Sequence, residues 1–227
     1  MTDVTARVGV RALGRIDYAR AVAAMRDFTE RRDVRTLDEL WLLEHPPVYT
    51  LGLKARAKSV AAGNIPVIAT DRGGDVTYHG PGQPVVYVLM DLNRRRWGVH
   101  RLVTTIEQAV IDLLADYDIA GARRPGAPGV YVDARKIAAL GLRVRRGASY
   151  HGVALNVRMD TAPFAAIDPC GYPGLAVAQL AEYVPDADPA VIGPALQERL
   201  ASAFGYTARL DHGHALPASS DAAIINA

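Results

Sequence analysis

The sequence predicts an α/β fold, and three observations support this class. Residues 16–32 and 99–119 carry apolar side chains at the spacing of amphipathic helices. Short runs rich in valine, leucine and tyrosine recur between these stretches, as is typical of strands. The chain has 227 residues, 50% of them hydrophobic, which is enough for one sizeable core. Since no linker divides the chain, we expect a single catalytic domain over residues 1–227.

The first half of the chain adds three predicted strands to the helix at its start. Residues 39–44 and 48–51 read as a pair of strands in one sheet, separated by the breaker His45-Pro46-Pro47. Residues 52–63 are basic and rich in small side chains, so we expect an exposed, mobile loop. The next strand is predicted at residues 65–69, directly before a glycine-rich stretch.

The part of the chain after the glycine-rich stretch is predicted to contain two helices, at residues 99–119 and 189–204, and four strands, at residues 84–90, 129–132, 136–145 and 149–157. The last three strands are expected to form an antiparallel meander, with Gly141 interrupting the second of them. Residues 164–174 read as irregular, and residues 210–227 as a frayed tail outside any regular element.

Composition excludes several classes of function. A net charge of +2 is too small to indicate binding to nucleic acid or to a membrane surface. Neither a signal-peptide core nor an apolar run of ~20 residues is present, so we expect a soluble, cytoplasmic protein. The single cysteine, Cys170, rules out an internal disulfide or a zinc–cysteine cluster, and the six histidines are scattered. We therefore predict no metal site.

Residues 71–83 concentrate more special chemistry than any other stretch. Two pairs of glycines flank a short strand with β-branched and aromatic side chains. The glycines allow a close approach of the backbone to a ligand, and they hold Arg72 and His79 near the two turns. The alternative is a tight hairpin with a solvated arginine and a capping histidine.

Cys170 is a candidate nucleophile. A lone cysteine is most often a small buried hydrophobe. Here it lies between Pro169 and Gly171 in a turn-rich segment, so we expect its thiol at a surface or cleft. A helix that began near Leu175 would stabilise the thiolate through its dipole. A nucleophilic cysteine also needs a base or a cation within reach.

Lys136 is the candidate partner of this thiol, because it interrupts an otherwise apolar strand. The alternative is a lysine that protects a sheet edge from aggregation. Beside a thiol, an ammonium lowers the thiol pKa, and a desolvated amine accepts its proton. His79 and His151 are further possible bases, although His151 taken alone reads as a core histidine.

Four stretches together resemble the lipoyl(octanoyl) transferases, which move octanoyl groups from acyl carrier protein to protein lysines. The stretches are RGGDVTYHGPGQ at residues 72–83, RKI at 135–137 followed by Gly141, HGVALN at 151–156, and DPCG at 168–171. Their order and spacing also agree with that family. The resemblance extends over residues 40–204, and it implies the mixed sheet with flanking helices of the biotin and lipoate protein ligases.

The resemblance implies a mechanism with two catalytic residues. Cys170 would attack the octanoyl thioester carried by acyl carrier protein, and a lysine of an apo lipoyl domain would displace the acyl group from Cys170. Lys136 would lower the thiol pKa and later accept the proton of the amine. The lipoyl domains would be those of the 2-oxoacid dehydrogenase complexes and the glycine cleavage H protein. No cofactor is implied, because phosphopantetheine arrives on the carrier protein.

The resemblance also implies an apolar acyl slot. Its walls would come from Arg72, Gly73, Gly74, Asp75, Val76, Thr77, Tyr78, His79, Ala139, Leu140, Gly141, Gly152, Val153 and Ala154, with His151 and Asn156 in support. Backbone N–H groups near the glycines would stabilise the oxyanion. Basic clusters, including Lys54, Arg56 and Lys58, would steer acidic substrate proteins toward the site.

Two alternatives belong to other classes. An ATP-dependent lipoate or biotin protein ligase would share the glycine-rich loop and the lysine, but it would form an acyl-adenylate. A non-catalytic acyl-carrier-binding protein would use Cys170 only as a structural residue. Cys170 within its DPCG stretch argues against the ligase.

Overall fold

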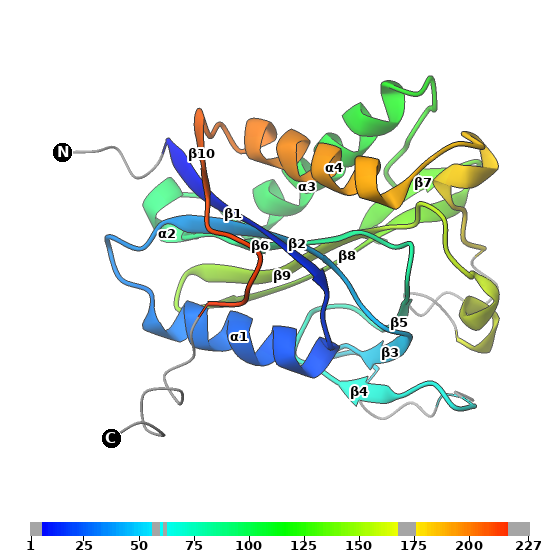
Figure 1. Cartoon of the computed structure of the whole chain (residues 1–227), viewed down its shortest axis with the longest axis horizontal. Coiled ribbons are helices and arrows are strands. Elements are labelled where there is room, and N and C mark those ends of the chain that lie inside the picture. The colour runs from blue at the N-terminus through cyan, green and yellow to red at the C-terminus, as the bar shows by residue number, and fades with distance from the viewer. Residues whose placement is uncertain (1–5, 56–59, 61–62, 168–175, 218–227) are drawn as a thin grey trace.

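A computed structural model describes residues 6–55, 60, 63–167 and 176–217, and it confirms the α/β class with a mixed sheet between helices (Figure 1). Within this part of the chain a sheet of seven strands has the order β10-β1-β2-β6-β9-β8-β7. These strands are β1 (Arg7–Arg15), β2 (Asp38–Glu44), β6 (Val85–Leu89), β7 (Gly129–Val132), β8 (Arg135–Arg145), β9 (Ala148–Leu155) and β10 (Ala208–Asp211). Strands β7, β8 and β9 form the predicted antiparallel meander.

Helices cover both faces of the large sheet, as Figure 1 shows. Helix α1 (Tyr18–Arg31) lies on one face and buries Tyr18, Ala21, Val22 and Met25, which share one side of the helix. Helices α3 (Val99–Ala115) and α4 (Pro189–Ala203) cover the other face over the larger apolar core. Shorter elements are α2 (Leu92–Arg95) and the 3₁₀ turns η1 (Ala162–Ala166) and η3 (Leu180–Glu182).

A smaller sheet holds the glycine-rich stretch beside the large one. Strand β3 (Val48–Leu51) pairs parallel with β4 (Val67–Ala69) and antiparallel with β5 (Val76–His79). The prediction that residues 39–44 and 48–51 pair in one sheet was wrong, because β2 and β3 belong to different sheets. The breaker at residues 45–47 carries the chain from one sheet to the other.

Gly141 does not interrupt β8, so that prediction was also wrong. The strand pairs with β9 on both sides of Gly141, in one unbroken register. A Cβ atom at Gly141 would lie 2.9 Å from Cδ of Arg72. The glycine therefore serves the close approach of an arginine side chain and not a break in the strand.

Strands β1 and β10 were not predicted. In β1, Val8 and Val10 alternate with arginine and glycine, and most of β10 is exposed, so neither segment shows a strong apolar pattern. Both strands pair in parallel with partners that are remote in the sequence.

Helix α3 ends four residues before the predicted boundary at residue 119. In the described part of the chain, no helix is long and apolar enough to cross a membrane.

Gly82 provides a test of the turn that closes the glycine-rich stretch. Its φ is +82°, and a Cβ atom would lie 1.8 Å from the carbonyl oxygen of Arg158. We expect Gly82→Ala to lower the free energy of unfolding by about 3 kcal/mol, through backbone strain and overpacking. Urea denaturation measures this value. Gly98→Ala is the control, because no atom lies within 4 Å of its added Cβ. A similar loss in both variants would contradict this account.

Candidate active site

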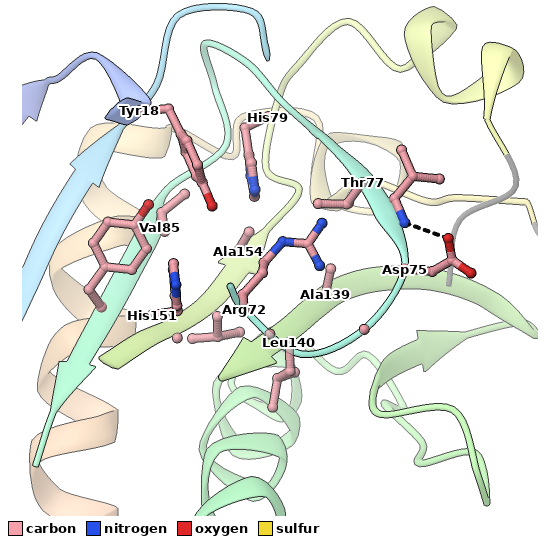
Figure 2. A pocket seen from close by; sticks show the side chains of 16 residues that line it. Tyr18, Arg72, Asp75, Thr77, His79, Val85, Ala139, Leu140, His151 and Ala154 are labelled. Atoms are coloured by element: carbon pink, nitrogen blue, oxygen red, sulfur yellow. Dashed lines mark hydrogen bonds between the residues drawn. The ribbon is translucent and has the colours of Figure 1, made fainter. Parts of the chain in front are cut away.

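A pocket opens where the glycine-rich stretch crosses strands β8 and β9 (Figure 2). It contains about 490 Å³ of space between atoms, part of it open to solvent. The structure brings together twelve of the fourteen predicted slot residues around it: Arg72, Gly74, Asp75, Val76, Thr77, His79, Ala139, Leu140, Gly141, Gly152, Val153 and Ala154. Tyr18, Val85, Tyr87 and His151 complete the lining.

Small side chains form one wall of this pocket. Ala139 pairs with Ala154, and Gly141 pairs with Gly152, across β8 and β9. A Cβ atom on Gly152 would lie only 2.0 Å from the carbonyl oxygen of Val86, so no larger residue fits there. Two adjacent strands thus leave an apolar space beside the sheet.

Arg72 forms the opposite wall, and its side chain is only 7% exposed. Its Nη2 donates to the carbonyl oxygen of Thr50 at 2.7 Å, and Nε and Nη2 both donate to the Thr50 hydroxyl. Nη1 donates to the carbonyl oxygen of Gly73 at 3.0 Å. The planar guanidinium therefore locks the glycine-rich stretch onto β3 with a fixed geometry.

Two predicted slot residues do not line the pocket. The amide of Gly73 donates to the carbonyl oxygen of Leu142 at 2.8 Å, which ties the stretch to β8. Tyr78 packs its ring against Tyr49 and Phe164, with centroid distances of 5.5 Å to each. Both residues therefore support the pocket wall from outside the pocket.

Neutral histidines lie at one side of the pocket: His79 lines it, and His45 packs against His79 with a ring-centroid distance of 5.7 Å. His79 Nδ1 lies 2.7 Å from Oε1 of Gln83, and His45 Nδ1 lies 2.7 Å from the carbonyl oxygen of Ile16. Because both oxygens only accept, each Nδ1 carries a proton. Burial lowers the pKa of His45 to about 4 and that of His79 to about 3. The tyrosine hydroxyl of Tyr87 donates to the free Nε2 of His45 at 2.6 Å.

Asn156, a predicted supporting residue, does not line the pocket but is hydrogen-bonded to it through Gln83. Gln83 Nε2 donates to its Oδ1 at 2.8 Å, and its Nδ2 donates to the carbonyl oxygen of Ala178 at 2.9 Å. A hydrogen-bonded chain thus runs from His79 through Gln83 and Asn156 to residue 178. It connects the pocket to the described segment that begins at residue 176.

His151 lines the pocket and is only 1% exposed. Its Nε2 lies 3.0 Å from Oδ1 of Asp71. Asp71 also contacts Arg26 Nη2 at 3.1 Å and accepts from the Tyr150 hydroxyl at 2.6 Å. These donors hold the pKa of Asp71 well below its usual range, although burial acts in the opposite direction. The carboxylate therefore fixes the His151 ring.

Lys136 is buried within β8, and it does not line the pocket itself. Its Nζ donates to the carbonyl oxygen of Pro128 at 3.0 Å and lies 5.1 Å from the ring centroid of Tyr131. Its backbone N–H donates to the carbonyl oxygen of Ala176 at 3.0 Å. The predicted nucleophile Cys170 lies outside the described residues, as do Arg56 and Lys58.

Sequence reasoning missed several residues of this site. Tyr18 and Tyr87 reach the pocket from α1 and β6, and no local motif marks them. Asp71 and Gln83 are the first and last residues of the glycine-rich stretch. Their position next to this stretch could have identified them as candidate site residues. Among the described residues, no three histidine, cysteine, aspartate or glutamate side chains form a group that could hold a metal ion.

The arginine cluster at residues 94–96 is used in part for structure. Arg94 and Arg95 contact the buried carboxylate of Asp38 at 2.7 and 3.5 Å, together with Arg32 at 2.6 Å. Such buried pairs hold α2 against the sheet. Arg94 and Arg95 are therefore partly buried residues with a structural role.

The fold defines a class of protein. Lipoate-protein ligase A, solved with ATP, superposes with a TM-score of 0.71 at 15% identity, over 90% of this chain and 89% of that one. Biotin protein ligase from Aquifex aeolicus, in complex with biotin and ATP, gives 0.58 at 12% identity, over 86% and 70%. The chain thus has the fold of the lipoate and biotin protein ligases.

Sequence comparison identifies the family. The model of the lipoyl protein ligase A/B catalytic domain matches residues 17–203. An octanoyltransferase from Thiobacillus denitrificans is 61% identical over 75% of this chain and 78% of that protein. One from an Enterobacter species is 53% identical over 86% and 92%. The chain belongs to this catalytic-domain family and, within it, to the octanoyltransferases, which confirms the resemblance.

The buried histidines predict a specific dependence of stability on pH. Their folded pKa values lie below the unfolded value of 6.5, so at lower pH the unfolded chain binds protons that the folded protein does not. We expect the free energy of unfolding to fall by roughly 4 kcal/mol between pH 7.5 and 5, about half from each of His45 and His79.

Urea titrations at several pH values measure this loss. His79→Asn should remove about half of the pH dependence, whatever its effect on stability at pH 7.5. His100→Asn, at an exposed position, should leave it unchanged. An unaltered pH dependence in His79→Asn would show that the folded protein does not exclude this proton.

Proposed function

We propose that this protein transfers an octanoyl group from octanoyl-acyl carrier protein to a lysine of an apo lipoyl domain, by way of a thioester on Cys170. The pocket is the observation that carries this proposal. Its small-residue wall, its neutral histidines and its buried arginine leave a largely apolar space for an uncharged chain. The names of the curated relatives support the choice of octanoyl as that chain.

In the first step, the Cys170 thiolate attacks the thioester carbonyl, and the phosphopantetheine thiol leaves with a proton. In the second step, the neutral lysine amine of the lipoyl domain attacks the S-octanoyl cysteine. An amide forms, and the Cys170 thiol is released. The acyl group arrives already activated as a thioester, so neither step needs ATP or a resident cofactor.

Lys136 is the proposed acid–base group. A buried ammonium favours the thiolate of a nearby cysteine, and the corresponding amine accepts the proton of the attacking lysine. Two features support this role. Its Nζ is oriented by the carbonyl oxygen of Pro128, and its backbone is bonded to Ala176, six residues after Cys170 in the chain.

We infer that the acceptors are the lipoyl domains of the 2-oxoacid dehydrogenase complexes and the glycine cleavage H protein. We place the reaction in the cytoplasm, where a single unpaired cysteine stays reduced. Lys54 and its basic neighbours are expected to attract acidic partner proteins to the pocket mouth.

Intact-mass analysis tests the covalent route. Wild-type protein mixed with octanoyl-acyl carrier protein, without ATP, is expected to gain one octanoyl group and to lose it when apo lipoyl domain is added. Cys170→Ser should form no stable thioester adduct. Lys136→Met removes the charge at similar length, and we expect it to slow acylation by about 10²-fold or more.

The matching control replaces octanoyl-acyl carrier protein by octanoate with ATP and Mg²⁺. We expect no octanoyl-lipoyl domain from this mixture. Acylation that appears only with ATP, with Cys170→Ser as active as wild type, would identify an ATP-dependent ligase and overturn the proposal.

A further inference from the structure

Glu107 is a buried carboxylate that the proposed mechanism does not use. It lies in the middle of α3 and is only 5% exposed. The other buried residues of this helix are all apolar: Leu102, Ile106, Ala109, Val110, Leu113 and Leu114. Burying a carboxylate in such a helix face is costly unless its oxygens are paired, so the contacts of Glu107 indicate what the charge is needed for.

One oxygen of Glu107 holds a backbone amide at the start of β7. Its Oε1 accepts from the N–H of Gly129 at 3.0 Å, and this hydrogen bond is buried. Its Oε2 lies 3.2 Å from Nε of Arg123, whose side chain is 41% exposed. The ion pair with Arg123 therefore reaches solvent, where it is screened and contributes little. The contact with Gly129 is the one that depends on a buried acceptor.

The same peptide unit binds Lys136 at its other end. The carbonyl oxygen of Pro128 accepts from Nζ of Lys136 at 3.0 Å. This carbonyl and the N–H of Gly129 belong to one planar amide group and point in opposite directions. An acceptor that fixes the N–H therefore also fixes the direction of the carbonyl. A carboxylate at the N–H end in addition polarises the amide and strengthens its carbonyl oxygen as an acceptor.

The backbone of β7 is irregular where the side chain of Lys136 meets it. Gly129 has a φ of +139°, and a Cβ atom there would lie 3.1 Å from Cε and 3.2 Å from Nζ of Lys136. The register between β7 and β8 shifts by one residue at the same place, because Val130 pairs with Ala138 and Tyr131 pairs with Lys136. Both features bring the lysine side chain close to the peptide unit that Glu107 holds.

We propose that Glu107 is a positioning residue for Lys136: it holds the N–H of Gly129 and thereby fixes the carbonyl oxygen of Pro128, which orients the lysine amine. This inference rests on the proposed acid–base role of Lys136. A lysine side chain is long and flexible, and a fixed acceptor beside its Nζ restricts the positions that the amine samples. Because Glu107 acts through Lys136, its loss slows the chemistry without weakening substrate binding.

The first test measures single-turnover acylation of Cys170 by octanoyl-acyl carrier protein, followed by intact mass. It yields a maximal rate and the carrier-protein concentration that gives half of this rate. Glu107→Met keeps the length of the side chain and suits a helix, but its thioether is a much weaker acceptor. We expect it to lower the maximal rate by about tenfold and to change the half-saturating concentration by less than about threefold.

Glu107→Gln is the matched control. Its amide oxygen can still accept from Gly129, and the half-exposed Arg123 can turn into solvent, so the maximal rate should stay within about threefold of wild type. Arg123→Met removes the ion pair but keeps the contact with Gly129, and it should also retain the rate. Glu107→Asn is too short to reach Gly129, and it should be as slow as Glu107→Met. It provides the same comparison if Glu107→Met does not fold.

A double-mutant cycle separates positioning from a general structural role. In the Lys136→Met background, Glu107→Met should change the acylation rate by less than about twofold, because the residue on which Glu107 acts is absent. A glutamate that only stabilised the fold would cost the same factor in both backgrounds.

Three results would overturn the inference. They are an unchanged maximal rate in Glu107→Met or Glu107→Asn, a rate in Glu107→Gln as low as in Glu107→Met, and an equal loss in the two backgrounds of the cycle. A wild type that forms no octanoyl adduct, or a Lys136→Met variant as fast as wild type, would instead contradict the proposed function.

Discussion

The site depends on how Arg72 is held inside the protein. A buried guanidinium needs hydrogen-bond acceptors for its donors, and Thr50 of β3 supplies two of them. The side chain reaches Thr50 only by passing over β8, where Gly141 leaves room for it. One interaction thus sets the distance between the small sheet and the large sheet, and the space enclosed between them is the pocket. The glycines of the stretch follow from this constraint, because they allow the backbone to lie close to the strands.

The charges around the pocket suit an uncharged ligand. Arg72 donates to backbone and hydroxyl oxygens, and His45, His79 and His151 are held neutral by burial. The charge of the Asp71 carboxylate is paired with Arg26, and its oxygens also accept hydrogen bonds from His151 and Tyr150. A neutral acyl chain enters such a space without leaving a buried charge unpaired.

The sequence predicted those parts of the structure that are determined by short stretches of the chain. The periodicity of α1 and α3, the β7–β9 meander and the position of the glycine-rich stretch could all be read from short windows. The parallel pairing of β1 with β10 could not, because the two strands lie far apart in the chain and β10 has no apolar pattern. The position of Tyr18 in the pocket could not be predicted either, because this residue comes from α1, which is remote in the sequence from the glycine-rich stretch. The left-handed backbone of His151 is imposed by its contacts and leaves no mark in the sequence.

A crystal structure of the S-octanoyl protein would test the central claim most directly, namely that the space beneath Arg72 is the acyl slot. The account predicts electron density for the chain between the glycine-rich stretch and the β8–β9 wall, with its carbonyl toward Lys136. An acyl chain found elsewhere, for example in the groove between Leu42, Pro84 and Pro194, would contradict it.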